Sequence, residues 1–165
     1  MNTATVADIM ERDAYSCSSR ATLEDVTAAL IELGVSSLPV VDDERRVVGF
    51  ISDGDIMRAI AEHKTRSIFS GGEATTLYYD DESIEHKVLA LKKRTVMELA
   101  TRKVLCVTEN RGIGQVADML AKKKFKKLPV IDEYGRLVGV IRRSSITRYA
   151  FDLLFHDESA AKARL

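Results

Sequence analysis

The chain repeats itself at a constant offset of 90 residues, and no gap is needed to align the two copies. Three markers carry the repeat: Thr5-Val6 recurs as Thr95-Val96, Leu38–Val40 recurs as Leu128–Val130, and Gly49 recurs as Gly139. Such a repeat predicts one structural unit that occurs twice, because both copies carry the same local preferences. Any fold of this chain must accommodate two copies of that unit.

The residue pattern of each copy predicts the same order of elements: strand, helix, strand, strand, helix. The segments AYSCSS and VLCVTE predict the first strands, and LPVVD and LPVID predict buried ones. A polar turn follows, DDER or DEYG, and then a second apolar strand, VVGFI or LVGVI. The first helix carries apolar residues on one face: Leu23, Val26 and Leu30 in one copy, and Ile113, Val116 and Leu120 in the other.

The helix ends can also be predicted. Thr22 with Asp25 resembles a capping pair at a helix start, and Gly34 is a typical residue at a helix end. The last helix of each copy is expected from Asp53 to about Glu62 and from Ser144 to about Phe155.

These patterns predict an α+β (α/β-like) fold. One copy of about 55 residues is marginal alone, so we expect two β-α-β-β-α repeats packed sheet to sheet with pseudo-twofold symmetry. The expected boundaries are repeat 1 at 1–62, a linker with a connecting helix at 63–94, repeat 2 at 95–156 and a flexible tail at 157–165. In the linker, SGGEATT predicts a loop, and Asp80-Asp81-Glu82 predict the start of a helix with Ile84, Val88 and Leu91 on one face that packs on the repeats.

Composition restricts the function. The net charge is +0, which gives no general attraction to nucleic acid or membranes. The two cysteines, Cys17 and Cys106, are too few for a disulfide framework, and no leader or membrane-spanning apolar run is evident. The three histidines lack partners at metal-ligand spacing. We expect a cytoplasmic protein without a metal site or membrane insertion.

The strand-to-helix junctions are similar to those of CBS domains, the regulatory modules named after cystathionine β-synthase. That family's pattern reads Gly, apolar, any, Ser or Thr, any, any, Asp, and copy one matches it at Gly49, Phe50, Ile51, Ser52 and Asp55. The resemblance extends from about Thr5 to Phe155. It implies a cleft between the repeats that binds an adenosine-containing ligand such as AMP, ADP or ATP, with S-adenosylmethionine also possible.

The resemblance implies roles for Ser52 and Asp55. A carboxylate at a helix start can accept hydrogen bonds from both ribose hydroxyls, and Asp55 is expected to do so. Ser52 would offer its hydroxyl to ribose or phosphate, beside backbone N–H groups that favour an anion. As an alternative, Ser52 and Asp53 only cap the helix, an explanation that does not require Asp55 at its spacing.

The resemblance also implies that basic residues of one copy meet the phosphate of a ligand held by the other. Four residues stand at matching positions: Lys126, Lys127, Arg142 and Arg143. The adenine ring is expected against Phe50, Val104, Leu105, Phe125 and Pro129, although core packing explains apolar residues equally well. Lys122 to Lys124 are read as an ordinary basic helix end.

Copy two departs from the pattern. Arg142 replaces the Ser or Thr, and Ser145 replaces the aspartate, so a site around Ser145 lacks the carboxylate for ribose. We therefore expect one nucleotide site per chain, centred on Asp55.

The function expected from these residues is a nucleotide-sensing regulatory module, acting on an unidentified protein and assembled as a homodimer. Ser70 to Asp80 is a candidate for transmitting a change of shape. The alternative is a dimerisation module that binds no nucleotide, with contacts from Ile56, Ile60, Ile146 and Phe151. Specific nucleic-acid binding through the lysine run and enzymatic activity are both disfavoured, because no reader helix or catalytic constellation is evident.

Overall fold

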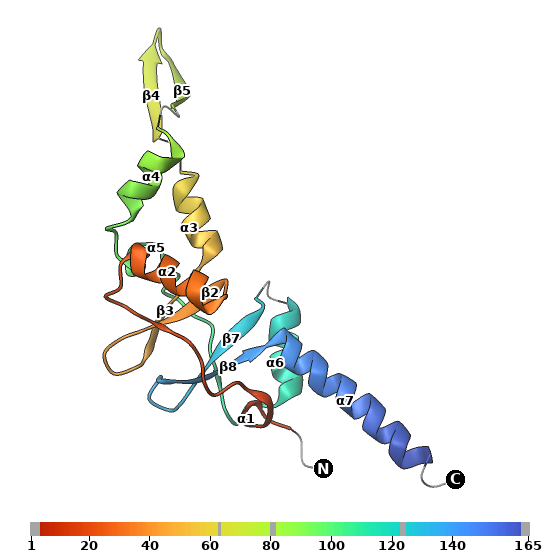
Figure 1. Ribbon diagram of the computed structural model, residues 1–165. Helices are drawn as coiled ribbons and strands as arrows, with labels where there is room; N and C mark the ends of the chain where they lie inside the picture. The colour runs from red at the N-terminus through yellow and green to blue at the C-terminus, as the bar shows by residue number, and fades with distance from the viewer. Residues whose placement is uncertain (1–3, 63, 80–81, 123–124, 163–165) are drawn as a thin grey trace. The chain divides into compact units, whose positions relative to one another are not determined.

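The computed structural model describes residues 4–62, 64–79, 82–122 and 125–162 (Figure 1). The chain divides into two compact units, which we describe separately. Unit 1 consists of Met1–Ser16, Val41–Val48 and Lys103–Leu165, and unit 2 consists of Cys17–Val40 and Gly49–Arg102. This division does not follow the two sequence repeats.

Both repeats have the predicted order of elements. The first contains β1 (Cys17–Ser18), α2 (Leu23–Leu33), β2 (Ser37–Val41), β3 (Val47–Ser52) and α3 (Asp53–Ile60). The second contains β6 (Val107–Thr108), α6 (Ile113–Lys122), β7 (Lys127–Ile131), β8 (Leu137–Arg142) and α7 (Arg143–Lys162). The sheets have the orders β1-β2-β3 and β6-β7-β8, with β6 parallel and β8 antiparallel to β7. The α+β class is confirmed.

Three boundaries differ from the prediction. The strands β1 and β6 are two residues long, shorter than AYSCSS and VLCVTE suggest. Helix α7 continues to Lys162, beyond the expected end at Phe155. Among the described residues, no helix has the length and apolar character that crossing a bilayer requires.

Two short helices, α1 (Val6–Ile9) and α5 (Val96–Leu99), were not predicted. In unit 1, the segment that contains α1 is attached to the second repeat. Val6 N–H donates to the Arg111 carbonyl at 2.9 Å, and Glu11 and Val140 exchange two backbone hydrogen bonds of 2.9 Å. The N-terminal segment is therefore part of the unit that holds repeat 2.

Unit 2 contains the equivalent bonds, each shifted by the repeat offset. Val96 N–H donates to the Ala21 carbonyl at 2.9 Å, and Phe50 and Thr101 exchange two bonds of 2.9 Å. Helix α5 thus packs with repeat 1, as α1 packs with repeat 2. Each repeat is completed by the segment that precedes the other.

The helix faces predicted from apolar spacing are buried. In unit 1 the core consists of Val6, Val107, Ile113, Val116, Leu120, Leu128, Val130 and Ile141. In unit 2 the equivalent helix buries Leu23, Val26 and Leu30. Thr22 caps that helix and Gly34 ends it in the left-handed region, with a φ of 62°, so both predicted ends are confirmed.

The linker contains a hairpin where a loop was predicted. Strands β4 (Lys64–Ser70) and β5 (Glu73–Tyr79) pair antiparallel around Gly71 and Gly72, whose φ angles are 64° and 85°. Two successive residues with positive φ suit a two-residue hairpin turn, and glycine adopts them without strain. The prediction of a loop at SGGEATT was wrong because the two glycines form only the turn.

Helix α4 (Ile84–Leu91) follows the hairpin and contacts α3 in unit 2. Its cap is Ser83, whose hydroxyl accepts a hydrogen bond from His86 N–H at 3.3 Å. Asp80 and Asp81, two of the three residues expected at its start, lie outside the described residues. Of its predicted apolar face, Leu91 is buried, but Ile84 and Val88 are 60% and 45% exposed.

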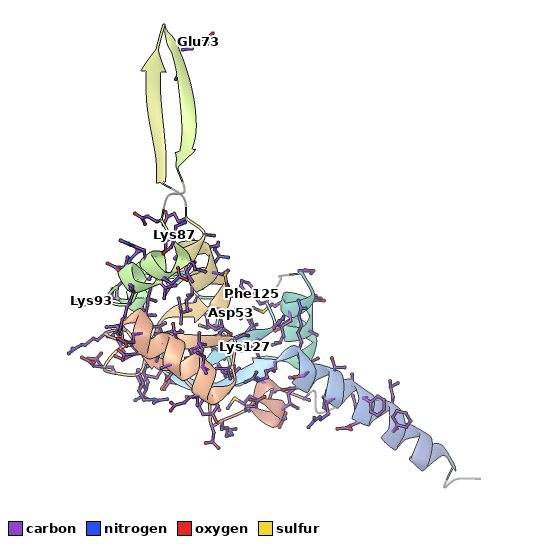
Figure 2. The ribbon with its side chains drawn as sticks, turned by 45° about the horizontal axis from the view of Figure 1, so that its top comes forward. Asp53, Glu73, Lys87, Lys93, Phe125 and Lys127 are labelled. Atoms are coloured by element: carbon purple, nitrogen blue, oxygen red, sulfur yellow. The ribbon has the colours of Figure 1, made fainter. Side chains whose placement is uncertain are left out.

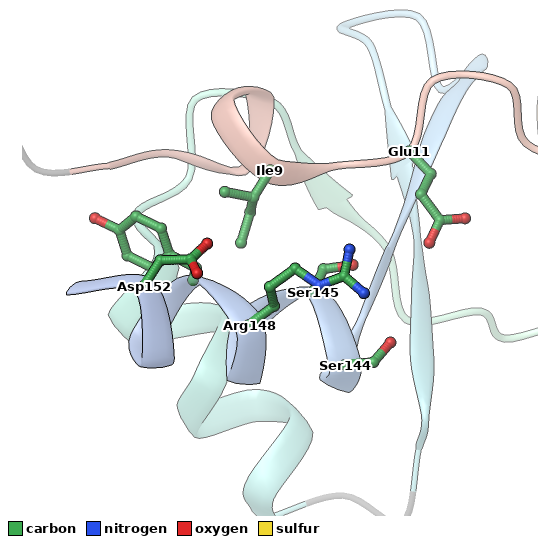
Figure 3. A pocket seen from close by; sticks show the side chains of 7 residues that line it. Ile9, Glu11, Ser144, Ser145, Arg148 and Asp152 are labelled. Atoms are coloured by element: carbon green, nitrogen blue, oxygen red, sulfur yellow. The ribbon is translucent and has the colours of Figure 1, made fainter. Parts of the chain in front are cut away.

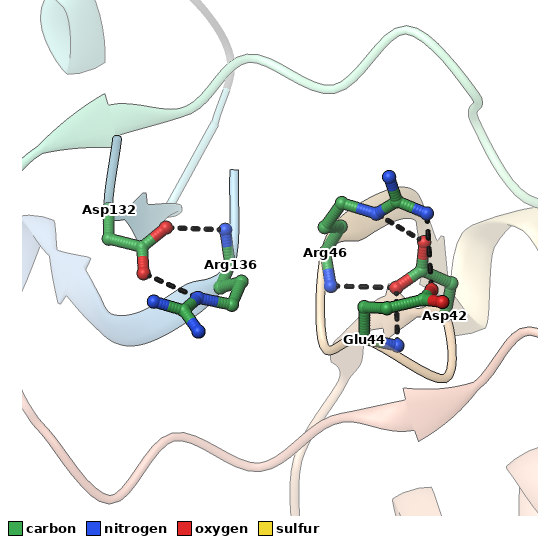
Figure 4. Close-up of polar contacts among 5 residues, drawn as sticks. All are labelled: Asp42, Glu44, Arg46, Asp132 and Arg136. Atoms are coloured by element: carbon green, nitrogen blue, oxygen red, sulfur yellow. Dashed lines mark hydrogen bonds and ion pairs between the residues drawn. The ribbon is translucent and has the colours of Figure 1, made fainter. Parts of the chain in front are cut away.

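The polar turns of the two repeats lie side by side in unit 1 (Figure 4). In each turn, an aspartate accepts bonds from the backbone and guanidinium of an arginine four residues later: Asp42 with Arg46, and Asp132 with Arg136. Backbone bonds of 3.0 and 2.9 Å join the turns reciprocally, from Val47 to Gly135 and from Leu137 to Arg45.

Candidate functional site

Ser52 and Asp55 form a capping box at the start of α3 in unit 2. Asp55 Oδ2 accepts hydrogen bonds from the Ser52 N–H at 2.8 Å and from its hydroxyl at 2.9 Å. The Ser52 hydroxyl in turn accepts a bond from Asp55 N–H at 3.3 Å. Our premise that capping does not require Asp55 was therefore wrong, because the third helical position is where a capping box places its acid.

The second oxygen of Asp55 also has a partner. Oδ1 accepts from the guanidinium of Arg58, one helical turn later. The Asp55 side chain is 10% exposed, whereas that of Arg58 is 74% exposed. The guanidinium end of this ion pair is in solvent, where water competes for it and weakens the pair. A ligand hydroxyl can therefore displace Arg58 from Asp55 at small cost, while the capping bonds keep the carboxylate in place.

Lys127 and Arg142 lie directly opposite each other in the β7–β8 pair of unit 1. Arg142 Nε lies 2.9 and 3.1 Å from the two carboxylate oxygens of Glu11. The pKa of Lys127 is lowered from 10.5 to about 8, mainly by burial and then by the charge of Arg142, while Glu11 opposes the shift. Lys127, Arg142 and Glu11 thus lie near one another in this corner of unit 1.

Arg143 and Lys126 lie at a second corner of the same unit. The Arg143 guanidinium donates to the Leu120 carbonyl at 2.8 Å, and its backbone N–H donates to the Lys126 carbonyl at 3.0 Å. The Lys126 side chain is exposed. Arg143 therefore connects the end of α6 to the start of β7, which is a structural role besides the predicted one.

The predicted adenine-contacting residues lie in different environments. Phe125, just before β7, is 43% exposed (Figure 2), and Phe50 in β3 is half-buried. Val104 and Leu105 are half-buried and precede β6, although we expected them at a strand start. Pro129 is fully buried in β7. Lys123 and Lys124 lie outside the described residues.

The structure brings the predicted residues together in groups. Ser52 and Asp55 are in contact, and Phe50 belongs to the same unit. The other eight residues belong to unit 1, where Lys127 pairs with Arg142 and Lys126 contacts Arg143. That both groups bind one nucleotide stays a prediction.

A pocket of about 360 Å³ opens in unit 1 around Ser145, between α7 and the segment of α1 (Figure 3). Its lining consists of Ile9, Glu11, Ser144, Ser145, Arg148, Tyr149 and Asp152. Of these residues, only Ser145 was singled out from the sequence as part of a candidate site. The repeat could have pointed to Arg148 as well, because it stands 90 residues after Arg58, its counterpart in the first repeat. No signal pointed to Ile9 or Glu11, which reach the pocket through tertiary packing.

Replacing Lys127 with methionine is expected to raise the free energy of unfolding by about 1 kcal/mol at pH 7, because a partly buried charge is removed and solvent screens part of its cost. The folded-state pKa of Lys127, about 8, lies below its usual value of 10.5. The charged lysine therefore destabilises the folded state fully below pH 8, and this destabilisation disappears as the pH rises from 8 to 10.5. Urea unfolding at pH 7 and pH 10 should show the gain shrinking.

Lys126→Met is the matched control, since its side chain is exposed and its loss should leave stability unchanged. A Lys127→Met variant less stable than wild type at pH 7 would contradict this account of Lys127.

Comparisons with known proteins find the same two repeats. A family model of the CBS domain matches residues 6–62 and 96–152. The CBS domain-containing protein CBSX2 of Arabidopsis thaliana, a chloroplastic protein, is 28% identical over 165 residues, which cover 94% of this chain and 67% of CBSX2. L-aspartate semialdehyde sulfurtransferase of Methanocaldococcus jannaschii is 25% identical over 143 residues, which cover 87% of this chain but only 22% of the enzyme.

Two solved structures are similar at 25% sequence identity. The crystal structure of CBSX2 in complex with AMP has a TM-score of 0.68, and the match covers 90% of this chain and 97% of that one. The CBS domain pair of protein MJ0100, in complex with 5′-methylthioadenosine and S-adenosyl-L-methionine, has a TM-score of 0.65 and covers 91% and 98%. Because the family model matches both repeats and more than half of the residues, the chain belongs to the CBS domain family.

Proposed function

We propose that this protein is a regulatory module that binds an adenosine-containing ligand and thereby modulates a partner protein. The observation that carries the proposal is the pair of Ser52 and Asp55, which matches the family's motif in full and holds a carboxylate at the start of α3. Two similar structures, CBSX2 with AMP and the MJ0100 pair with S-adenosyl-L-methionine, support this class of ligand.

Asp55 is the proposed acceptor for the ribose. Its Oδ2 is occupied by the capping bonds, so Oδ1 is the oxygen available to a ligand once Arg58 moves. A carboxylate oxygen has two lone pairs and can accept both ribose hydroxyls. The preorganised carboxylate favours a ligand with vicinal hydroxyls over one without them.

Lys127 and Arg142 are the proposed phosphate contacts, with Lys126 and Arg143 as secondary ones. Lys127 carries a charge that burial disfavours, so a phosphate that approaches it relieves the penalty. Arg142 is held by Glu11 through Nε, which keeps the guanidinium in a fixed orientation. We propose that this cationic corner and Asp55 act on the same ligand, and that each chain binds one nucleotide.

The second candidate function is a nucleotide-independent homodimerisation module. It is favoured by an apolar groove of about 280 Å³ in unit 2, where Ile56 and Ile60 meet residues of α2 and α4. In unit 1, Ile146 packs against the core, and Phe151 is 57% exposed beside Phe155. Exposed apolar side chains on helices are typical of protein contact surfaces.

Titration calorimetry with AMP, ADP, ATP and S-adenosylmethionine tests the proposal, with guanosine monophosphate as the control for the base. We expect saturable binding of at least one adenosyl ligand at one site per chain. Sedimentation equilibrium with and without ligand measures the assembly in the same samples. A dimer that binds none of the four ligands would favour the second candidate function and exclude the first.

A further inference from the structure

The pocket of unit 1 contains two opposite charges that the protein itself does not pair. Arg148 and Asp152 stand one helical turn apart on α7, and both line the pocket. Within the part of the chain that the structure describes, neither makes an ion pair or a side-chain hydrogen bond. Both residues are exposed, and Arg148 precedes Asp152, which is the less favourable order for an ion pair four residues apart on a helix, so both charges are left to a ligand.

In the first repeat, the equivalent arginine does have a partner. Arg58, the counterpart of Arg148, is bound to Asp55 in unit 2. The residue that corresponds to Asp55 is Ser145, which has no charge. The substitution leaves the Arg148 guanidinium beside the hydroxyls of Ser144 and Ser145, in a position suited to receive a ligand carboxylate.

The other acidic group of the pocket, Glu11, is already neutralised. Both of its carboxylate oxygens lie within 3.1 Å of Arg142 Nε, and its charge also acts on Lys127. The charges left for a ligand are therefore one cation, Arg148, and one anion, Asp152. A ligand with a single charge would leave one of them unmatched.

The remaining wall is apolar. Ile9 points from the α1 segment toward α7, opposite Arg148 and Asp152 (Figure 3), and Tyr149 contributes its ring. The volume of about 360 Å³ is at the lower end of the range for small-molecule sites. The lining thus offers one site for an anion, one for a cation and a small apolar surface.

We propose that this pocket binds a small α-amino acid with an aliphatic side chain. Its carboxylate is bound by Arg148 with the serine hydroxyls, its ammonium by Asp152, and its side chain lies against Ile9 and Tyr149. The lining residues of this pocket belong to unit 1 and do not include Asp55, and the amino-acid proposal does not rest on the proposed nucleotide site.

The test uses L-valine and two analogues that each lack one charge, isovalerate and isobutylamine. Binding is followed by the amide shifts of residues 144–152 in a heteronuclear NMR titration of the full chain. We expect saturable binding of L-valine and at least tenfold weaker binding of both analogues. Arg148→Gln and Asp152→Asn should each weaken L-valine binding by roughly tenfold, the loss of one charge-assisted contact.

The matched controls are Arg58→Gln, which removes the equivalent arginine of the first repeat, and Asp55→Ala. Both should leave L-valine binding unchanged, and Asp55→Ala separates the two sites because it should weaken nucleotide binding without weakening L-valine binding. The proposal is overturned by the absence of saturable L-valine binding, by equal affinity for isovalerate, or by unchanged affinity in Arg148→Gln.

Discussion

The Asp55→Ala variant is expected to bind its adenosyl ligand more weakly by about 2 to 4 kcal/mol, roughly a 30- to 700-fold increase in Kd. Asp55 offers a charged acceptor that is 10% exposed and held by two hydrogen bonds from Ser52. Hydrogen bonds from ribose to such an acceptor are charge-assisted, and their loss leaves both ribose hydroxyls without a partner. Titration calorimetry measures the change.

The same variant also loses a helix cap, so a control for folding is needed. Asp25 occupies the equivalent position of another capping box in unit 2, where its Oδ2 accepts from the Thr22 N–H at 3.0 Å and hydroxyl at 2.8 Å. Asp25→Ala and Asp55→Ala should each lower the free energy of unfolding to a similar extent, because each removes the acid of a capping box. Only Asp55→Ala should weaken nucleotide binding, and equal affinities for the two variants would show that Asp55 does not contact the ligand.

The Gly139→Ala variant is expected to destabilise the protein by about 2 to 4 kcal/mol. A Cβ atom at this position would lie 2.7 Å from the backbone carbonyl oxygen of Glu11 and 3.1 Å from the sulfur of Met10. The carbonyl cannot move aside, because the same residue exchanges two backbone bonds with Val140. The added methyl group must therefore separate the α1 segment from β8.

Gly49→Ala is the matched control at the equivalent position of the first repeat. There the added atom would meet the Met97 sulfur and the Val40 Cβ, each at 3.3 Å. Small shifts of side chains relieve such contacts, so a loss of about 1 kcal/mol is expected. Urea unfolding followed by circular dichroism measures both variants. A Gly139→Ala variant as stable as Gly49→Ala would mean that the α1 segment is not held against β8 as described.

The elements of this protein could be predicted because their signals are local. Apolar spacing identified the buried faces of α2 and α6, and residue chemistry identified the ends of α2 at Thr22 and Gly34. The hairpin at Gly71-Gly72 was missed because glycines were read as a loop rather than as a turn between strands. The capping role of Asp55 was also local, and a stricter use of residue spacing would have found it.

The sequence by itself determined the repeat, the order of elements in each copy and the motif at Ser52 and Asp55, since these follow from neighbours within a few residues. Only the tertiary structure decided that each repeat is completed by the segment before the other, and that Glu11 meets Arg142 across 131 positions of the chain. It also decided that Arg148 has no partner among the described residues while Arg58 has one. The physical reason is that such pairings depend on how distant strands and helices pack, which no local pattern of residues encodes.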